Sequence, residues 1–302
     1  MTLYRIRFKL CSSIVTPLKG DTIWGHIVWG IANHEGNAAV TDFLEKEISD
    51  TPALVVSSAF PAEMVCRPMP PPERNIILDI DAYSEIKNKK KRKYASASKY
   101  FANTEIKIDE EKRQSPLENI QVTHNTIDRF TNSVLEEKSP YSTEERWPKI
   151  TDWDLYVLSS SDPDRIKELV QWAFENGYGA DASTGKGRIS EIGKPEEVKP
   201  IIKTKPGNTY TYMALGPFVG SKNGMTDLRA DIFVRSGKLG GAFAASMIPY
   251  KKPVVLYDEG AIFTCDKPIE YTGIMLEKMH DSEEFNICQS GFAPVIPVDL
   301  KE

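Results

Sequence analysis

Residues 177–188 are the part of this sequence whose residue types could most directly bind a ligand. The stretch reads Gly-Tyr-Gly-Ala-Asp-Ala-Ser-Thr-Gly-Lys-Gly-Arg, and its glycines have the spacing G-x-G-x5-G-x-G. Glycine reaches positive φ without strain and lets backbone N–H groups approach a ligand closely, and such N–H groups form anion-binding concavities. The hydroxyls and cations between the glycines suit phosphate oxygens. The pattern predicts a loop that holds a phosphodiester backbone or a nucleotide, with a helix-to-strand turn as the alternative.

The elements expected on either side of this loop exclude two nucleotide-binding motifs. Asp162 is a typical N-cap, with Pro163 at the first helical position, and apolar residues at 166, 169, 170, 173 and 174 then form one helix face. Alternation over 188–192 predicts a strand after the loop. A Walker phosphate loop and a dinucleotide fingerprint both run from strand to helix, which is the reverse order. Gly179 and Gly185 are also one residue too far apart for a Walker loop, and Gly187 stands where that motif needs a hydroxyl.

The composition bounds the class of protein. With 302 residues, 40% hydrophobic and 27% charged, the chain is long enough for one large or two ordinary domains. The net charge of −5 provides no global attraction for nucleic acid, so a local patch must hold any such partner. Four scattered cysteines without a C-x-x-C pair predict free thiols in a reducing cytoplasm. The alternating start of the chain predicts a strand rather than a signal peptide, and no apolar run is long enough to span a membrane.

The order of expected elements predicts an α+β fold. A strand over 3–11, with Arg5, Arg7 and Lys9 on one face, precedes a helix capped by Asp21 or Thr22. Strands follow over 53–60, 119–126 and 153–158, and then the helix that precedes the glycine-rich loop. This order resembles a ferredoxin-like unit. Residues 193–206 are expected to be a linker to a β-rich second half, with strands over 209–216, 231–234, 254–257, 261–264 and 294–298.

Residues 61–118 differ in character from the rest of the first half and are expected to be an insertion. A proline-rich run at 68–72 is stiff and extended, and residues 87–93 form the densest basic block of the chain. Tyr94, Lys99, Tyr100 and Phe101 follow it. Two interpretations stay open: a solvated basic loop, or an electrostatic footprint for a polyanion.

Residues that could perform catalysis do not form a recognisable motif. Neither H-E-x-x-H nor G-x-S-x-G occurs, and the four histidines are far apart in sequence. His124 could act as a general base near RNA or be an ordinary strand residue, and His26 could contact RNA or be satisfied within the core. The pair Asp79 and Asp81 has the carboxylates of a two-metal site but also suits the polar side of a short strand. No catalytic residue, metal or cofactor is therefore assigned.

Several stretches resemble one family in order and spacing. The glycine-rich loop after its helix resembles that of the repeat-associated mysterious proteins (RAMPs) of CRISPR systems. Residues 18–31, which begin Leu-Lys-Gly-Asp-Thr-Ile-Trp-Gly-His, are similar to the first helix of the fourth subunit of the type III-A (Csm) effector. His124-Asn125-Thr126-Ile127-Asp128-Arg129 followed by Tyr141, and Arg235-Ser236-Gly237-Lys238-Leu239-Gly240-Gly241 with Pro249-Tyr250, resemble later parts of that subunit. The basic run at 87–93 departs from the family's pattern.

The resemblance implies two tandem ferredoxin-like (RRM-like) domains, at 1–197 with an insertion of about 61–118 and at 198–302. It implies a non-catalytic, cytoplasmic RNA-binding subunit that caps the 5′ handle of the CRISPR RNA for antiviral defence. The implied partners are the CRISPR RNA, the large polymerase-type subunit, the backbone RAMP subunit that cleaves target RNA, and target RNA through the guide duplex. In related subunits a protruding hairpin, or thumb, displaces one base at the handle–guide junction, and this role is assigned to residues 61–118.

The residues assigned to RNA combine the loop chemistry with the resembling stretches. They are Lys19, Thr22, His26, His124, Asn125, Arg129, Gly177, Gly179, Ser183, Thr184, Gly185, Lys186, Gly187, Arg188, Arg235 and Lys238. Two other classes remain as alternatives. One is a metal-independent ribonuclease of the same superfamily that processes CRISPR precursor RNA and needs a histidine-based acid–base site. The other is a generic RNA-binding module without docking surfaces.

Overall fold

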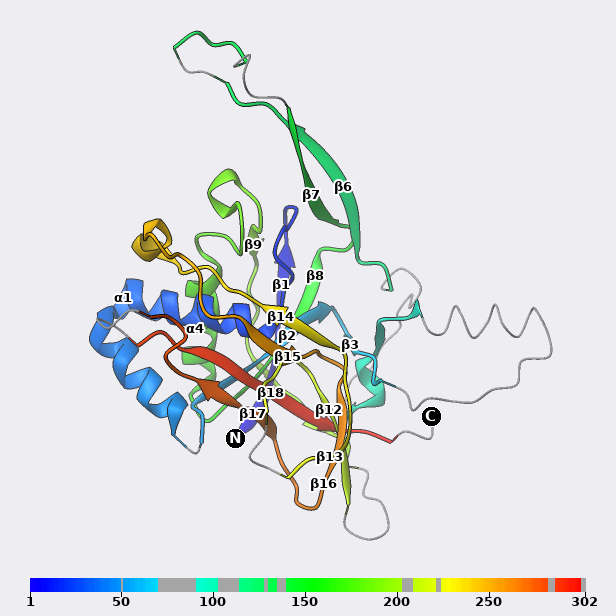
Figure 1. Cartoon of the computed structure of the whole chain (residues 1–302). Coiled ribbons are helices and arrows are strands. Elements are labelled where there is room, and N and C mark those ends of the chain that lie inside the picture. Colours follow the sequence, from blue (N-terminus) through cyan, green and yellow to red (C-terminus); the bar gives the residue numbers. More distant parts are fainter. Residues whose placement is uncertain are drawn as a thin grey trace, which may run out of the picture.

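The first half of the chain forms an antiparallel sheet with the strand order β10–β1–β8–β2 (Figure 1). A computed structural model describes residues 1–49, 51–69, 91–102, 114–127, 130–134, 140–202, 209–220, 224–281 and 286–299. The sheet consists of β1 (Thr2–Leu10), β2 (Leu54–Pro61), β8 (Asp152–Ser159), and the short β9 (Ile189–Ser190) and β10 (Glu196–Glu197), which both pair with β1. Helix α1 (Gly20–Ile48) lies between β1 and β2, and α4 (Pro163–Phe174) lies between β8 and β9. This is the β-α-β, β-α-β order expected for the first half.

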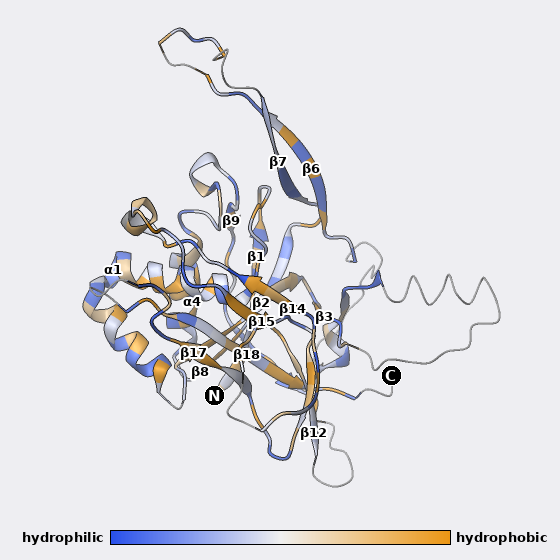
Figure 2. Ribbon diagram, viewed as in Figure 1, coloured by the Kyte–Doolittle hydropathy of each residue, from blue (hydrophilic) through white to orange (hydrophobic). Residues whose placement is uncertain are grey.

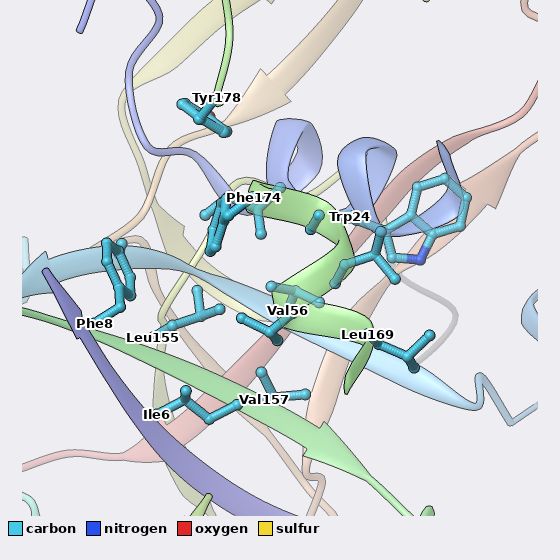
Figure 3. Close-up of a cluster of buried hydrophobic side chains, with 14 of the residues drawn as sticks. Ile6, Phe8, Trp24, Val56, Leu155, Val157, Leu169, Phe174 and Tyr178 are labelled. Carbon is cyan, nitrogen blue, oxygen red and sulfur yellow. The ribbon is translucent and has the colours of Figure 1, made fainter. Parts of the chain in front are cut away.

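Both helices pack on one face of this sheet. Because side chains alternate along a strand, Ile6, Phe8 and Leu10 of β1 all point toward the helices and are fully buried. Figure 3 shows Phe8 beside Phe174 of α4, with Trp24 of α1 in the same cluster. Helix α4 has the predicted form: Asp162 Oδ1 accepts a hydrogen bond from Asp164 N at 2.9 Å, and the five predicted apolar positions are buried.

Helix α1 differs from its prediction at the N-terminus. It begins at Gly20, and its N-cap residue, Lys19, makes no side-chain capping bond. Asp21 does not cap the helix because its carboxylate accepts hydrogen bonds from Arg235 and Gln289 instead. The helix is kinked at Gly36, where φ is 85°.

The second half forms another antiparallel sheet, with the order β13–β16–β12–β18–β17. Its strands are β12 (Tyr210–Ala214), β13 (Thr226–Arg229), β16 (Ile262–Cys265), β17 (Tyr271–Leu276) and β18 (Gln289–Pro297), and a separate ribbon pairs β14 (Ile232–Arg235) with β15 (Val254–Tyr257). Strands β13 and β17 lie where no strand was predicted. No α-helix occurs in the described part of this half, whose only helical segment is the short η3 (Gly241–Ala245).

The two halves share a hydrophobic core. The second face of the first sheet contributes Leu3, Val55 and Tyr156, and the second half contributes residues of β12 and β18, including Met213 and Ile296. Every residue of β18 is buried. A third cluster, which contains Phe218 and Phe263, fills the other side of the second sheet.

The predicted insertion and linker are partly built into this core. Residues 61–118 contain β3 (Met64–Cys66), β4 (Tyr94–Ser96), η1 (Ala97–Lys99) and β5 (Phe101–Ala102). Phe101 is buried and stacks on Tyr156 with ring centroids 5.1 Å apart, so its expected place beside RNA is wrong. The linker prediction for 193–206 also needs correction, because β10 pairs with β1 and β11 (Lys199–Pro200) pairs with β5. Asp79, Asp81, Arg129 and residues 87–90 lie outside the described residues.

A long β-hairpin projects from the body of the molecule (Figure 1). It pairs β6 (Leu117–His124) with β7 (Tyr141–Pro148) in unbroken register, from Leu117 opposite Pro148 to His124 opposite Tyr141. Figure 2 shows that hydrophilic residues predominate along it. The sequence predicted β6 but not β7. In the described part of the chain, the hairpin of β6 and β7 projects, and it follows the segment that was expected to do so.

Candidate nucleic-acid interface

The glycine-rich loop follows α4 and folds back on itself. Its backbone has positive φ at Gly177, Gly179, Asp181, Gly185 and Gly187, with a short 3-10 turn, η2 (Ala182–Thr184), at its tip. Two of these glycines are sterically required. A Cβ at Gly179 would lie 2.5 Å from Thr16 Cβ, and a Cβ at Gly187 would overlap the carbonyl oxygen of Tyr178. Close packing within the protein therefore accounts for these two glycines.

Most backbone N–H groups of the loop donate hydrogen bonds within the protein. Gly187 N donates to Ser13 O at 2.7 Å, Ala180 N to Thr16 Oγ1 at 2.9 Å, and Arg188 N to Ser12 Oγ at 2.9 Å. Ser12, Ser13 and Thr16 all lie between β1 and α1, and sequence reasoning gave them no role. The expected cradle of amides for phosphate is thus largely occupied by hydrogen bonds within the protein, three of which go to the β1–α1 connection.

His26 of α1 contacts the loop near its start. Its Nε2 accepts a hydrogen bond from Gly179 N at 3.3 Å, and its ring lies 4.9 Å from the ring of Tyr178. Burial lowers the pKa of His26, which favours the neutral ring that can accept this bond. Thr22, one turn earlier on α1, interacts with the Tyr178 hydroxyl. These contacts favour the structural interpretation of His26.

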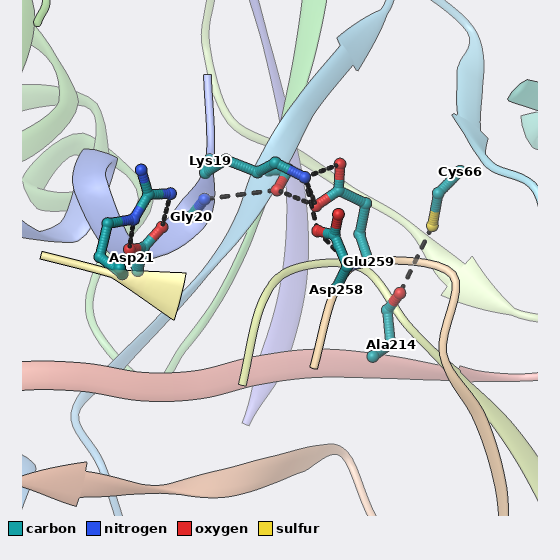
Figure 4. Close-up of polar contacts among 9 residues, drawn as sticks. Lys19, Gly20, Asp21, Cys66, Ala214, Asp258 and Glu259 are labelled. Carbon is teal, nitrogen blue, oxygen red and sulfur yellow. Dashed lines mark hydrogen bonds and ion pairs between the residues drawn. The ribbon is translucent and has the colours of Figure 1, made fainter. Parts of the chain in front are cut away.

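Three cations assigned to RNA form ion pairs inside the protein. Lys186 pairs with Glu145 of β7, and only 12% of its side chain is exposed. Figure 4 shows the second, Lys19, at the start of α1. Lys19 Nζ lies 2.5 Å from Asp258 Oδ1 and 2.6 Å from a carboxylate oxygen of Glu259.

The third cation, Arg235, donates to Asp21 through Nε at 2.9 Å and through Nη2 at 3.2 Å. A cation that is available to bind phosphate is not already paired with a buried carboxylate, as Arg235 is with Asp21. The assignment of Lys19, Lys186 and Arg235 to RNA therefore remains a prediction that these contacts do not support.

The tip of the loop keeps an exposed polar surface. Ser183, Thr184, Gly185 and Arg188 are exposed. The Thr184 hydroxyl donates to Asp181 O at 2.9 Å, so its proton is not available to a phosphate oxygen. A serine hydroxyl and a guanidinium donate hydrogen bonds to phosphate oxygens, and Ser183 and Arg188 supply these two groups. The part of the predicted site that remains accessible is thus the tip, from 183 to 185, together with Arg188.

A second glycine-rich segment rests on the same helix. Gly240 and Gly241 lie flat on the Trp29 ring, where a Cβ at Gly240 would overlap the indole. His26 and Trp29 are three residues apart and so lie on one face of α1. Lys238 is exposed on this segment, and its backbone bridges to Tyr250. Helix α1 therefore supports both glycine-rich segments side by side along one face.

The hairpin carries aromatic residues on one face only. His124 and Tyr141 stack with centroids 5.3 Å apart, and His124 Nε2 lies 2.9 Å from Thr143 Oγ1. Because cross-strand neighbours share a face, Trp147 and Ile120 lie on this same side. Tyr141 is 53% exposed and Trp147 is 44% exposed. Asn125, just beyond β6, is also exposed.

The base of the hairpin is tied to the β1–α1 connection and to the loop. Ile14 and Arg146 form a backbone bridge, and Arg146 Nη2 donates to Val15 O at 2.6 Å. Ser13 Oγ donates to Glu145 Oε2 at 2.7 Å. The hydrogen bond from Lys186 lowers the pKa of Glu145. Loop, connection and hairpin thus form one bonded unit, which the sequence did not reveal because β7 is rich in charged residues.

Two further features bear on the class of site. Within the described ranges, no three His, Cys, Asp or Glu side chains gather in a way that could hold a metal ion. In the same ranges, no helix is both long and apolar enough to cross a membrane.

Comparisons with known proteins identify the fold. Neither a family model nor a curated protein matches this sequence. A chain from the crystal structure of the Csm1–Csm4 cassette in complex with pppApA aligns over 100% of both chains, with a TM-score of 0.57 and 16% identity. A chain from the Csm3–Csm4 subcomplex of the type III-A CRISPR-Cas interference complex aligns over 98% of this chain and 99% of that chain, with a TM-score of 0.52 and 10% identity.

The chain therefore has the fold of a subunit of type III-A CRISPR effector complexes. Csm4 is the component that these two assemblies share. The resemblance predicted from residues 18–31, 124–129 and 235–241 is confirmed by this likeness, which extends over the whole chain.

Proposed function

We propose that this chain is the Csm4-type subunit of a type III-A CRISPR ribonucleoprotein and binds the 5′ handle of the CRISPR RNA without cleaving it. The observation that carries the proposal is the bonded unit of glycine-rich loop and hairpin, in a chain with the fold of these subunits. The loop contributes an exposed hydroxyl and an exposed guanidinium. The hairpin contributes the face with exposed aromatic rings, which is turned toward the loop. Single-stranded RNA is bound by this combination of backbone contacts and base stacking.

The hairpin is the better candidate for the projecting thumb. The sequence assigned this role to residues 61–118, but Phe101 of that segment is buried in the shared core. The hairpin projects and presents Tyr141 and Trp147 to solvent. We assign to it the displacement of a base at the junction of handle and guide. For the basic block at 87–93, both interpretations stay open: a solvated basic loop, or an electrostatic footprint for a polyanion.

The proposed partners are a large polymerase-type subunit, a target-cleaving backbone RAMP subunit and target RNA paired with the guide. The names of the similar structures support the two protein partners, since Csm4 is found there with Csm1 and with Csm3. The proposed architecture is two tandem ferredoxin-like halves, of which the second is β-rich, divided near residue 197. The proposed location is the cytoplasm.

The alternative is a metal-independent ribonuclease of the same superfamily. It needs a histidine that is free to move a proton. His26 accepts from Gly179, His34 stacks on Trp172, His124 is bonded to Thr143, and His280 is bonded to Ile248 O. A hydrogen bond to one ring nitrogen also orients a catalytic histidine, so the cleavage test below, with His124, decides between the two roles.

One experiment separates these functions. The protein is purified after co-expression with the products of the adjacent genes. The bound RNA is then sequenced, and the bound proteins are identified. We expect RNAs that share a 5′ handle, together with a large subunit. The pure chain is then incubated with labelled repeat RNA, with chelator and with metal ions. Specific cleavage that is lost in His124→Ala would contradict the proposal, and RNA without a shared 5′ sequence would favour a generic RNA-binding module.

Tyr141→Ala tests the hairpin. Loss of one stacked base should weaken binding of handle RNA by about 1–3 kcal/mol. Ser142→Ala is the matched control, because Ser142 lies on the opposite face of the same strand. If Tyr141→Ala and Ser142→Ala bound handle RNA with equal affinity, the hairpin would not be part of the RNA site.

A further inference from the structure

Glu145 is a buried carboxylate that joins three separate elements. It lies on β7, and only 1% of its side chain is exposed. It accepts from Lys186 of the glycine-rich loop and, at 2.7 Å, from Ser13 of the β1–α1 connection. Its Oε1 also lies 3.8 Å from His124 Nε2 on β6. In the described part of the hairpin, every other glutamate is exposed.

The alternation of β7 places Glu145 on the face that carries the aromatic residues. Tyr141, Thr143 and Trp147 share its face, while Ser142 and Glu144 lie on the other. Because Lys186 reaches Glu145 from the loop, this face of the hairpin is turned toward the loop. The same contact thus determines which side of the hairpin the loop meets.

Among the described residues, the hairpin has few other attachments that could fix its direction. A two-stranded hairpin is marginally stable by itself, and most side chains of β6 are exposed. Beyond Glu145, its base is held by the Ile14–Arg146 bridge and by the Arg146 contact with Val15 O. Both of these contacts reach the β1–α1 connection next to each other, at Ile14 and Val15, whereas the Glu145–Lys186 pair links β7 to the loop and so opposes rotation about that point. Removing one partner of a buried ion pair is strongly unfavourable, since the other charge is left desolvated.

We propose that Glu145 is a positioning residue that holds the hairpin at one angle to the glycine-rich loop. Through Lys186 and Ser13 it holds the aromatic face of the hairpin and the polar tip of the loop at a constant separation. RNA that contacts both then meets a rigid site and loses less ordering free energy on binding. The consequence for RNA rests on the proposed function; the lock between hairpin and loop does not.

The lock, by which we mean the contacts of Glu145 with Lys186 and Ser13, is tested without RNA by measuring the distance between hairpin and loop. Spin labels are placed at Ser142→Cys and Ser183→Cys, both exposed, in a Cys11→Ser background, and the distance distribution is recorded by pulsed electron resonance. We expect a narrow distribution in the otherwise unchanged protein. Glu145→Gln should broaden it at least twofold, and Glu144→Gln, its neighbour on the opposite face, should leave it unchanged. Thermal unfolding confirms that each variant is folded.

A second pair of variants approaches the lock from the loop. Lys186→Met should broaden the distribution as Glu145→Gln does, and Lys186→Arg, which keeps the charge, should preserve it. The double variant Glu145→Gln with Lys186→Met should be no broader than either single variant, because both remove the same contact. A distribution that stays narrow in Glu145→Gln and in Lys186→Met would overturn the proposal.

The consequence for RNA is measured separately on the same variants. Affinity for handle RNA should fall about tenfold in Glu145→Gln and stay unchanged in Glu144→Gln. A broadened distribution with unchanged RNA affinity would support the lock and contradict the RNA role of the hairpin. Unchanged distance and unchanged affinity together would overturn both.

Discussion

The Nε2 atom of His26 on α1 accepts a hydrogen bond from the backbone N–H of Gly179, 153 residues later in the chain, at 3.3 Å. This bond attaches the glycine-rich loop directly to α1, the helix that also supports the second glycine-rich segment through Trp29. The Nε2 atom can accept this bond only if the imidazole of His26 is neutral. Burial favours the neutral ring because it lowers the pKa of His26.

His26→Phe should loosen the loop without opening a large cavity. The phenyl ring fills the space beside Tyr178 but leaves the partly buried Gly179 N–H without its acceptor, which costs up to about 1 kcal/mol. Hydrogen exchange of the amides at 177–188 should accelerate, and the free energy of unfolding in urea should fall by that amount. His34→Phe is the control, since His34 is half-exposed and stacks on Trp172. Equal exchange in the two variants would show that His26 does not hold the loop.

Glu47 should make stability depend on pH. This fully buried carboxylate accepts from Leu54 N at 2.8 Å and from Trp24 Nε1 at 3.3 Å, and burial raises its pKa to about 7, above the ordinary 4.5. The folded protein then binds this proton more tightly than the unfolded chain. The free energy of unfolding should therefore fall as pH rises from about 4.5 to about 7 and change little above that.

Glu47→Gln should remove this dependence. The stability of the variant relative to the unchanged protein should rise across the same interval, by at most about 3 kcal/mol. Urea unfolding at a series of pH values measures it, and Glu45→Gln, exposed on the same helix, should follow the unchanged protein. A difference that stays constant from pH 4.5 to 7.5 would contradict the raised pKa.

Substitution by alanine should destabilise the protein more at Gly187 than at Gly185. Gly187→Ala forces a Cβ into the Tyr178 carbonyl oxygen at a φ of 64°, so the loop must shift, at a cost above about 2 kcal/mol. Gly185 has a φ of 94°, but a Cβ added there would meet no atom within 4 Å. Gly185→Ala should therefore cost about 1–2 kcal/mol of backbone strain. Thermal unfolding compares them, and equal destabilisation would show that φ alone determines the cost.

Arg188 should contribute to the salt dependence of RNA binding more than Lys186. Arg188→Ala removes an exposed cation and should reduce the slope of log K against log salt by about 1. Lys186→Ala should change this slope little, because that cation is already neutralised by Glu145. It should instead lower the stability of the protein. Titrations of handle RNA at several salt concentrations measure the slopes, and a larger change for Lys186 would restore its assignment to phosphate.

The parts of the fold that follow local rules were predictable. The capped helix α4 and the buried strands β2 and β8 are set by residue periodicity, which the sequence displays directly. Strand β7 was missed because its charged residues, Glu144 to Arg146, are consecutive and leave no apolar alternation. Glu145 is buried only through partners far away in the chain. The glycine-rich loop was located correctly, but its amides bond to Ser12, Ser13 and Thr16, whose roles depend on tertiary contact. Lys19 and Arg235 looked like free cations for the same reason.

The complete burial of β18 has a consequence for the order in which the protein is made. Its residues, together with Met213 of β12, cover Val55 and Tyr156 on the second face of the first sheet. During synthesis the part of that face that β18 covers remains open to solvent until residues 289–297 have left the ribosome. At about 5–20 residues per second, the delay after β8 is complete is roughly 7 to 28 seconds. A nascent chain in that interval presents a partly uncovered apolar sheet, which makes it a substrate for chaperones and prone to aggregation.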